Sequence, residues 1–130
     1  MIFSIVVQGA PHTQQSAESA LRFARAVLAE GHQIYRVFFS GDGIHNGSAL
    51  ATPQQDEGHV VAGWQALARD HQLDLVVCIA AALRRGVMDA SEAKRHDKAQ
   101  HNLAEGFTLS GLGQLTDAAL KSDRVVTFGS

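Results

Sequence analysis

The amino-acid sequence predicts an α/β fold built around a mostly parallel sheet of about five strands, with helices covering both faces. Apolar, β-branched runs alternate with segments of helical periodicity along the 130 residues. This alternation is typical of parallel strands joined by crossover helices. The runs are apolar almost throughout, as expected for strands buried on both faces. We therefore predict one domain, residues 1–130, with a flavodoxin-like, three-layer α/β/α architecture.

The first strand is predicted at residues 2–7, before a turn that contains Gly9 and Pro11. A helix is expected next, because apolar residues recur at helical spacing and Gly31 stands where a helix commonly ends. The apolar residues are Ala17, Ala20, Leu21, Ala24, Val27 and Leu28. The second strand is predicted at residues 33–39.

A polar, glycine-rich segment, residues 41–47, follows and is predicted to be a mobile surface loop. The next helix is predicted to begin at Thr52 and Pro53, since threonine is a good N-cap and proline suits the first helical position. Its apolar stripe consists of Val60, Val61, Trp64, Leu67 and Ala68. A third strand is predicted at residues 73–79.

The last third of the chain predicts two more helices and two more strands. Asp89 and Glu92 have the spacing of a capping box, so a polar helix is expected from there to about Gln100. Residues 107–109 predict a short fourth strand, and residues 124–128 predict a final one. The helix between them is predicted from the apolar residues Leu112, Leu115, Ala119 and Leu120.

Composition and charge make several classes of function improbable. Apolar residues form 45% of the chain and charged residues 18%, which is ordinary for a globular domain. The 11 basic and 13 acidic residues give a net charge of −2, whereas proteins that hold nucleic acid by its phosphates carry a basic excess. The basic clusters are small, so direct nucleic-acid binding is not expected. They are Arg84–Arg85 and Lys94–Arg95 with Lys98.

No targeting or membrane-spanning segment is expected. Every apolar run is well short of the roughly 20 residues that cross a bilayer. The first run also lacks the basic region that precedes the apolar part of a signal peptide. A cytoplasmic location is the default expectation, and the single cysteine, Cys78, agrees with a reducing compartment.

The functional interpretation depends on Cys78. It lies one residue before the end of the third predicted strand, and open α/β sheets carry their sites at the carboxyl ends of strands. The N–H groups that follow, and the guanidinium groups of Arg84 and Arg85, would favour the nucleophilic thiolate. Free cysteine is also among the most frequently buried residues, so a small core residue is the alternative. For the two arginines, the alternative is a pair of solvated charges.

Other motifs predict no comparable site. Residues 41–47 match neither G-x-G-x-x-G nor the Walker A pattern. The seven histidines lack the spacing of a metal site, and no G-x-S-x-G motif supports a serine hydrolase. We predict neither a metal site nor a phosphate-binding loop.

Three segments nevertheless resemble a known family. They are CIAAALRRGV at residues 78–87, GFTLSGLG at residues 106–113 and DRVVTF at residues 123–128. With weaker likeness elsewhere, they resemble sulfurtransferase subunits of the DsrE-like family along nearly the whole chain. One departure lies at residues 10–13, where a glycine-containing turn with an aromatic residue is expected and the sequence has Ala-Pro-His-Thr.

The resemblance implies a DsrE-like fold and a sulfur relay for tRNA. A cysteine matching Cys78 accepts sulfane sulfur as a persulfide and passes it on, and the sulfur ends in 2-thiouridine at the tRNA wobble position. The implied assembly is a heterohexamer with TusB-like and TusC-like homologous subunits. A TusA-like carrier is the implied donor and a TusE-like carrier the acceptor, with no metal or organic cofactor. A single cysteine suits such a relay, because no second thiol is present to resolve the persulfide into a disulfide.

Three alternatives remain at this point. The chain could be a DsrE-type subunit of a sulfur-oxidation pathway, with the same persulfide chemistry. It could be a non-catalytic scaffold subunit with an inert, buried Cys78. It could also be a flavodoxin-like domain that binds a small molecule.

Overall fold

The structure, a computed structural model, describes residues 1–129. Its strands are β1 (Ile2–Val7), β2 (Gln33–Phe39), β3 (Leu75–Cys78), β4 (Phe107–Ser110) and β5 (Arg124–Phe128). Its α-helices are α1 (Gln15–Ala29), α2 (Val60–His71), α3 (Ile79–Arg84), α4 (Ala90–Arg95) and α5 (Gly113–Lys121). A 3₁₀ helix, η1 (Gly41–Gly47), follows β2.

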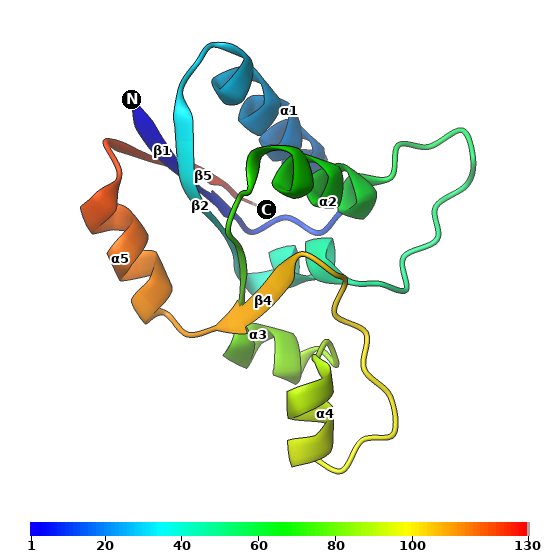
Figure 1. The fold of residues 1–130 in the computed structure, drawn as a ribbon. Coiled ribbons are helices and arrows are strands. Elements are labelled where there is room, and N and C mark those ends of the chain that lie inside the picture. The colour runs from blue at the N-terminus through cyan, green and yellow to red at the C-terminus, as the bar shows by residue number, and fades with distance from the viewer. Residues whose placement is uncertain (130) are drawn as a thin grey trace.

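The five strands form one sheet in the order β4-β3-β2-β1-β5, and every neighbouring pair is parallel. The predicted α/β fold class is confirmed. The chain steps from β1 through β2 and β3 to β4, and then crosses the whole sheet to reach β5 (Figure 1). All the carboxyl ends of the strands therefore lie at one edge of the sheet.

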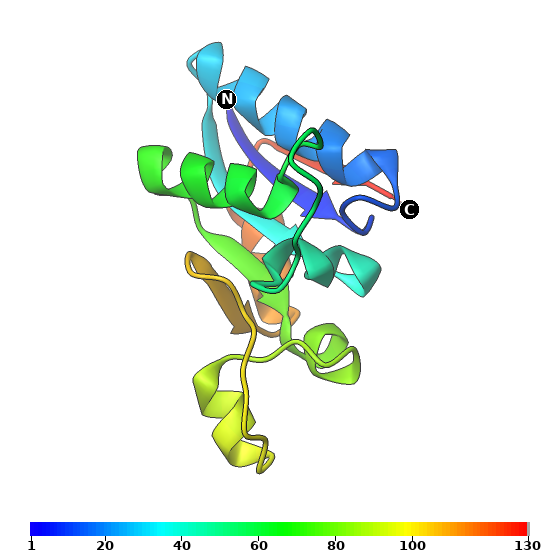
Figure 2. The same ribbon diagram turned by 90° about the vertical axis from the view of Figure 1, so that its right-hand side faces the viewer.

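The direction of these steps decides which face each helix covers. Right-handed crossovers in one direction put their helices on one face, and a crossover in the reverse direction puts its helix on the other. Accordingly, α1 and α2 pack together over one face, and α5 packs under β2, β1 and β5 on the opposite face (Figure 2). The predicted three layers are thus present.

The core lies between the sheet and the helices α1 and α2. Phe39 of β2 packs edge-to-face against Trp64 of α2, with ring centroids 5.3 Å apart. The predicted stripe of α2 is buried as expected. Helix α1 ends where Gly31 was expected to end it. The N–H of Gly31 donates to Leu28, the N–H of His32 donates to Val27, and Gly31 has a φ of 84°.

Two predictions between β2 and α2 are wrong. Residues 41–47 are not a mobile surface loop, because they form η1 and bury four of their residues. Helix α2 begins at Val60 rather than at Thr52. The side chain of His59 caps it by accepting from the N–H of Ala62. Thr52 and Pro53 belong to no helix or strand, and Gln54 and Glu57 bond to each other in a separate turn.

The last third of the chain also differs in detail. Helix α4 is capped by Asp89 as predicted but ends at Arg95, before Asp97 turns left-handed with a φ of 55°. Helix α5 buries Ala118 instead of Ala119, and Leu112 and Leu120 of its predicted stripe are exposed. Helix α3 has no counterpart in the prediction. No helix formed by residues 1–129 has both the length and the apolar composition that a bilayer crossing requires.

A bulge in β2 gathers charged groups under the sheet. Phe3 pairs with Ile34 but Ser4 pairs with Arg36, so Tyr35 is an extra residue in β2. The bulge lets Tyr35 and Arg36 both donate to the carboxylate of Asp117 on α5. Arg36 also donates to Asp74, at 2.8 Å, and is itself almost fully buried. This cluster fastens α5 to the sheet.

Candidate active site at Cys78

Cys78 is the last residue of β3 and the N-cap residue of α3. Its register partner on the neighbouring strand is Ser110, the last residue of β4. Strand alternation places the Cys78 side chain on the α5 face of the sheet. Arg36 and Phe38 face that side, Phe38 pairs with Val76, and Cys78 follows Val76 by two residues. The sulfur and the Ser110 hydroxyl therefore share one face at the carboxyl edge.

The connections on either side of Cys78 diverge. The chain leaving β3 enters α3, which packs against η1 on the side of α2. The chain leaving β4 enters α5 on the opposite face (Figure 1). Neighbouring strands whose connections leave on opposite faces create a crevice at their carboxyl ends, the usual place for a site in an open α/β sheet. Cys78 stands at this place.

The sulfur is largely shielded from solvent. Only 7% of Cys78 is exposed, and its side chain makes no capping hydrogen bond. Its neighbours at the edge are more open, because Ala80 and the turn at residues 111–113 are exposed. The N–H groups of Ile79, Ala80 and Ala81 open α3 and have no acceptor within the helix. The position of Cys78 at the carboxyl edge fits a functional site, whereas its burial fits a core residue.

The two arginines lie at the other end of α3. Arg84 is the last residue of this helix and is exposed, and Arg85 is its C-cap. Six helical residues span about 9 Å, so the arginine backbones and that of Cys78 are separated by about that length. The Arg85 guanidinium donates to Asp42, at 2.9 Å, and to the carbonyl of Ala81. The structure thus brings Arg85 to η1 and leaves Arg84 in solvent.

The polar segment η1 is tied to the β1–α1 loop and to α2 by a buried asparagine. The side chain of Asn46 is fully buried, donates to the carbonyls of Gly9 and Gly43, and accepts from the indole N–H of Trp64. This network explains why a glycine-rich segment is ordered here. Sequence reasoning missed the pairing of Asp42 with Arg85, because nothing local marks two residues 43 positions apart as partners.

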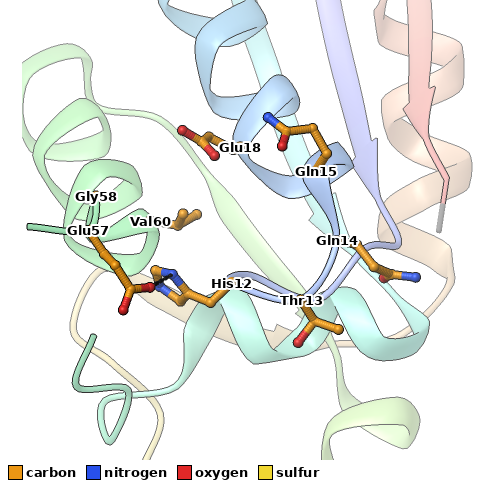
Figure 3. A pocket seen from close by; sticks show the side chains of 8 residues that line it. All are labelled: His12, Thr13, Gln14, Gln15, Glu18, Glu57, Gly58 and Val60. Carbon is orange, nitrogen blue, oxygen red and sulfur yellow. Dashed lines mark ion pairs between the residues drawn. The ribbon is translucent and has the colours of Figure 1, made fainter. Parts of the chain in front are cut away.

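A separate hollow of about 280 Å³ lies between the first turn of α1 and the segment before α2 (Figure 3). His12 and Glu57 approach within 3.8 Å of each other there, and the rest of its polar lining is formed by Thr13, Gln14, Gln15 and Glu18. None of its lining residues belongs to β3 or α3. The hollow is therefore not part of the Cys78 site. In the described part of the chain, no three His, Cys, Asp or Glu side chains gather as metal ligands.

A parallel α/β sheet with a lone cysteine at the crevice between β3 and β4 defines a class of small α/β proteins with a thiol at the sheet edge. Within this class, the chain belongs to the DsrE/DsrF-like family, whose model matches residues 1–128. The resemblance predicted from the sequence is confirmed.

Relatives in three genera cover almost the whole chain. Sulfurtransferase TusD of an Enterobacter species is 51% identical over 128 residues, which is 98% of this chain and 100% of that protein. A sulfurtransferase TusD homologue of Vibrio vulnificus is 49% identical over 97% of this chain and 96% of its own length. DsrE of Allochromatium vinosum is 47% identical over 99% of both chains.

A solved structure with the same fold is the YchN protein of E. coli. It superposes with a TM-score of 0.78 over 98% of this chain and 99% of its own, at 20% sequence identity. This similarity concerns the fold alone and agrees with the predicted DsrE-like architecture.

Proposed function

We propose that the chain is a sulfurtransferase that carries sulfane sulfur as a persulfide on Cys78. The observation that carries this proposal is the position of Cys78, the only cysteine of the chain, at the crevice between β3 and β4. Relatives named sulfurtransferases, about half identical over nearly their full length, support the class of reaction.

The transfer consists of two displacements at sulfur. First, the Cys78 thiolate attacks the outer sulfur of a donor persulfide. The donor's S–S bond breaks, the donor leaves as a thiolate, and Cys78 holds the persulfide. Then a thiolate of the acceptor attacks this outer sulfur, a new S–S bond forms on the acceptor, and Cys78 leaves as a thiolate. No net oxidation occurs in either step, so no further redox reagent is needed.

Neighbouring groups assist this chemistry in different degrees. The first N–H groups of α3 lie beside the Cys78 backbone and are the nearest donors to a sulfur anion. The backbones of Arg84 and Arg85 lie at the far end of the helix, and the Arg85 guanidinium turns back to the carbonyl of Ala81. The exposed turn at residues 111–113 directly follows Ser110, the register partner of Cys78.

The proposed pathway leads to 2-thiouridine at the tRNA wobble position. It rests on the TusD relatives and includes TusB-like and TusC-like subunits in a heterohexamer, a TusA-like donor and a TusE-like acceptor. The location is cytoplasmic, where Cys78 stays reduced. A chain upstream of the RNA-modifying enzyme has no need to hold RNA, which agrees with its net charge of −2.

Two specific observations favour other functions. The 47% identity to DsrE favours a sulfur-oxidation pathway with the same chemistry, and neighbouring genes for sulfite-reductase-type enzymes would identify it. The 7% exposure of Cys78 favours a scaffold subunit with an inert thiol. The scaffold hypothesis predicts normal tRNA thiolation in a strain that carries Cys78→Ser.

The experiment is intact-mass spectrometry of the reduced protein after incubation with a persulfidated TusA-like carrier. We expect one added sulfur on wild type, removed by a thiol reductant, and none on Cys78→Ser. The same incubation is repeated with the partner subunits present. If wild type gains no sulfur in either preparation, Cys78 is a core residue and the relay is refuted. Replacing Arg84 or Arg85 with Gln should reduce the loading rate by less than about threefold, because Arg84 is exposed to solvent and the charge of Arg85 is paired with Asp42.

A further inference from the structure

A groove of about 590 Å³ lies at the far end of α3. Its walls come from the segment after η1, the segment after α3 and the loop before β4. They include Leu50, Gly86, Met88, Lys98 and His101. Leu50 is 69% exposed and contributes to the apolar part of the lining.

The groove is preformed, because one asparagine joins its three walls. The Asn102 side chain accepts from the N–H of Met88, at 2.9 Å, and donates to the carbonyl of Gly86, at 3.0 Å. Its backbone bonds to Met88 and accepts from the N–H of Ala49, at 2.7 Å. An apolar side chain entering the groove would therefore meet a fixed surface and would not pay the cost of ordering it.

The segment that supplies most of the groove's lining is positively charged. Residues 84–101 contain five basic and three acidic residues, a net charge of +2, whereas the rest of the chain has six basic and ten acidic residues, a net charge of −4. Lys98, which lines the groove, is exposed and forms no ion pair within residues 1–129. A positively charged segment beside an apolar groove complements a partner that carries carboxylates around one apolar side chain.

The groove also has a fixed relation to the reactive sulfur. Gly86 follows the C-terminal end of α3 by two residues, and Cys78 caps the N-terminal end of the same helix. The helix spans about 9 Å. A partner anchored in the groove therefore lies within one short helix length of Cys78.

We propose that this groove docks the sulfur-carrier protein that exchanges sulfur with Cys78. The carrier presents an acidic segment with one apolar side chain, which enters the groove beside Leu50 and Met88, while its reactive cysteine lies at the other end of α3. This inference rests on the proposed persulfide relay and adds to it the surface and the chemistry of the partner.

The test measures the second-order rate of sulfur exchange with purified TusA-like and TusE-like carriers. The preparation is either the chain alone or the chain with its partner subunits. The one in which the wild-type protein transfers sulfur is used. Leu50→Asp places a carboxylate in the groove and should lower the rate with one carrier at least tenfold. Lys98→Glu should lower the same rate several-fold at low salt and weaken its dependence on ionic strength, since rim charges act mainly on association.

Matched controls separate docking from chemistry and from folding. Leu120→Asp changes another exposed leucine, on α5. Arg69→Glu reverses the charge of a basic side chain on α2. Both variants should exchange sulfur at the wild-type rate. Loading of Cys78 by a small-molecule persulfide, glutathione persulfide, should be equal in all four variants. The docking proposal is wrong if the wild-type protein transfers sulfur and both variants, Leu50→Asp and Lys98→Glu, exchange it with each carrier at the wild-type rate. If wild type itself takes up no sulfur, the persulfide relay is wrong.

Discussion

At the scale of single residues, Gly43 shows how closely η1 approaches the sheet. A Cβ atom at this position would lie 2.1 Å from the carbonyl oxygen of Val7, which is backbone and cannot rotate away. The residue must therefore be glycine even though its φ is not positive. The same close approach lets Asn46 reach the carbonyl of Gly9 and hold η1 against the loop after β1.

Gly43→Ala is expected to lower the free energy of unfolding by about 1–3 kcal/mol, the usual cost of an overpacked site. Urea denaturation of the purified variant measures this change. Gly58→Ala is the matched control, because nothing lies within 4 Å of its added Cβ. A substitution there should be neutral or stabilise by up to about 1 kcal/mol through the unfolded state. Equal stability of Gly43→Ala and wild type would contradict the close approach.

Cys78 is the residue that sequence analysis identified most directly. Its place at the end of an apolar run and before small residues was enough to locate it at the carboxyl edge. Its neighbour Ser110 was not predicted as a partner, because strand order cannot be read from the order of strands in the chain. The positions of Arg84 and Arg85 were not predictable either, since helix α3 carries them away from the sulfur.

At the scale of elements, the strands were predictable and the helix boundaries were less so. Each strand is an apolar run bounded by turn residues, and this signal is local. The start of α2 was misplaced because Thr52 and Pro53 form a good local capping pattern, while His59 caps the helix that tertiary packing selects. For α5, the spacing of the leucines suggested an apolar face, but the face that the helix buries against the sheet is the one that carries Ala118.

The bulge in β2 couples the attachment of α5 to pH. Two hydrogen bonds lower the pKa of the Asp117 carboxyl below its ordinary value. The bond from Tyr35 has the larger effect and the bond from Arg36 the smaller. In the unfolded chain this carboxyl has an ordinary pKa of about 3.9. The unfolded state therefore takes up a proton first as the solution is acidified. The stabilisation from Asp117 is complete above the unfolded pKa and is lost as the pH falls through the lower folded pKa.

Asp117→Asn is accordingly expected to unfold at a lower urea concentration than wild type at pH 7. The difference should shrink as the pH is lowered from 5 to 3, because the unfolded wild-type chain takes up a proton there while the folded carboxylate still resists it. Urea midpoints measured along this series test the expectation. Asp70→Asn is the control, since Asp70 is exposed and forms no ion pair within the described residues. A difference that stays constant over the series would mean that the charge of Asp117 has no part in holding α5.

At the scale of the whole molecule, the sheet is not equally stable across its width. Strands β1 and β2 have neighbours on both sides and are covered by α1 above and α5 below. Strand β5 lies at the edge, and three of its five residues are exposed. Local opening is easiest where few contacts must break. The sheet should therefore open from β5 before it opens from its centre.

Amide hydrogen exchange measured by NMR tests this order. The amides of residues 4–7 and 36–39, in the central strands, are expected to exchange most slowly, and those of residues 124–128 at least tenfold faster. Exchange in β5 as slow as in β1 would show that the edge strand opens only with the whole molecule. Phe128, which packs against Phe23 of α1, is the contact that would account for such a result.

The parallel sheet also has a practical consequence for any labelled form of the protein. The two ends of the chain lie on adjacent strands but at opposite edges of the sheet (Figure 1). A fluorophore or affinity tag ahead of β1 sits at the edge away from Cys78. A tag placed after β5 lies at the same edge of the sheet as the Cys78 thiol. Along that edge, β5 and β3 are three strand spacings, or about 14 Å, apart. An N-terminal tag therefore leaves the sulfur-exchanging edge free for a visiting carrier, whereas a C-terminal tag competes with that carrier for space.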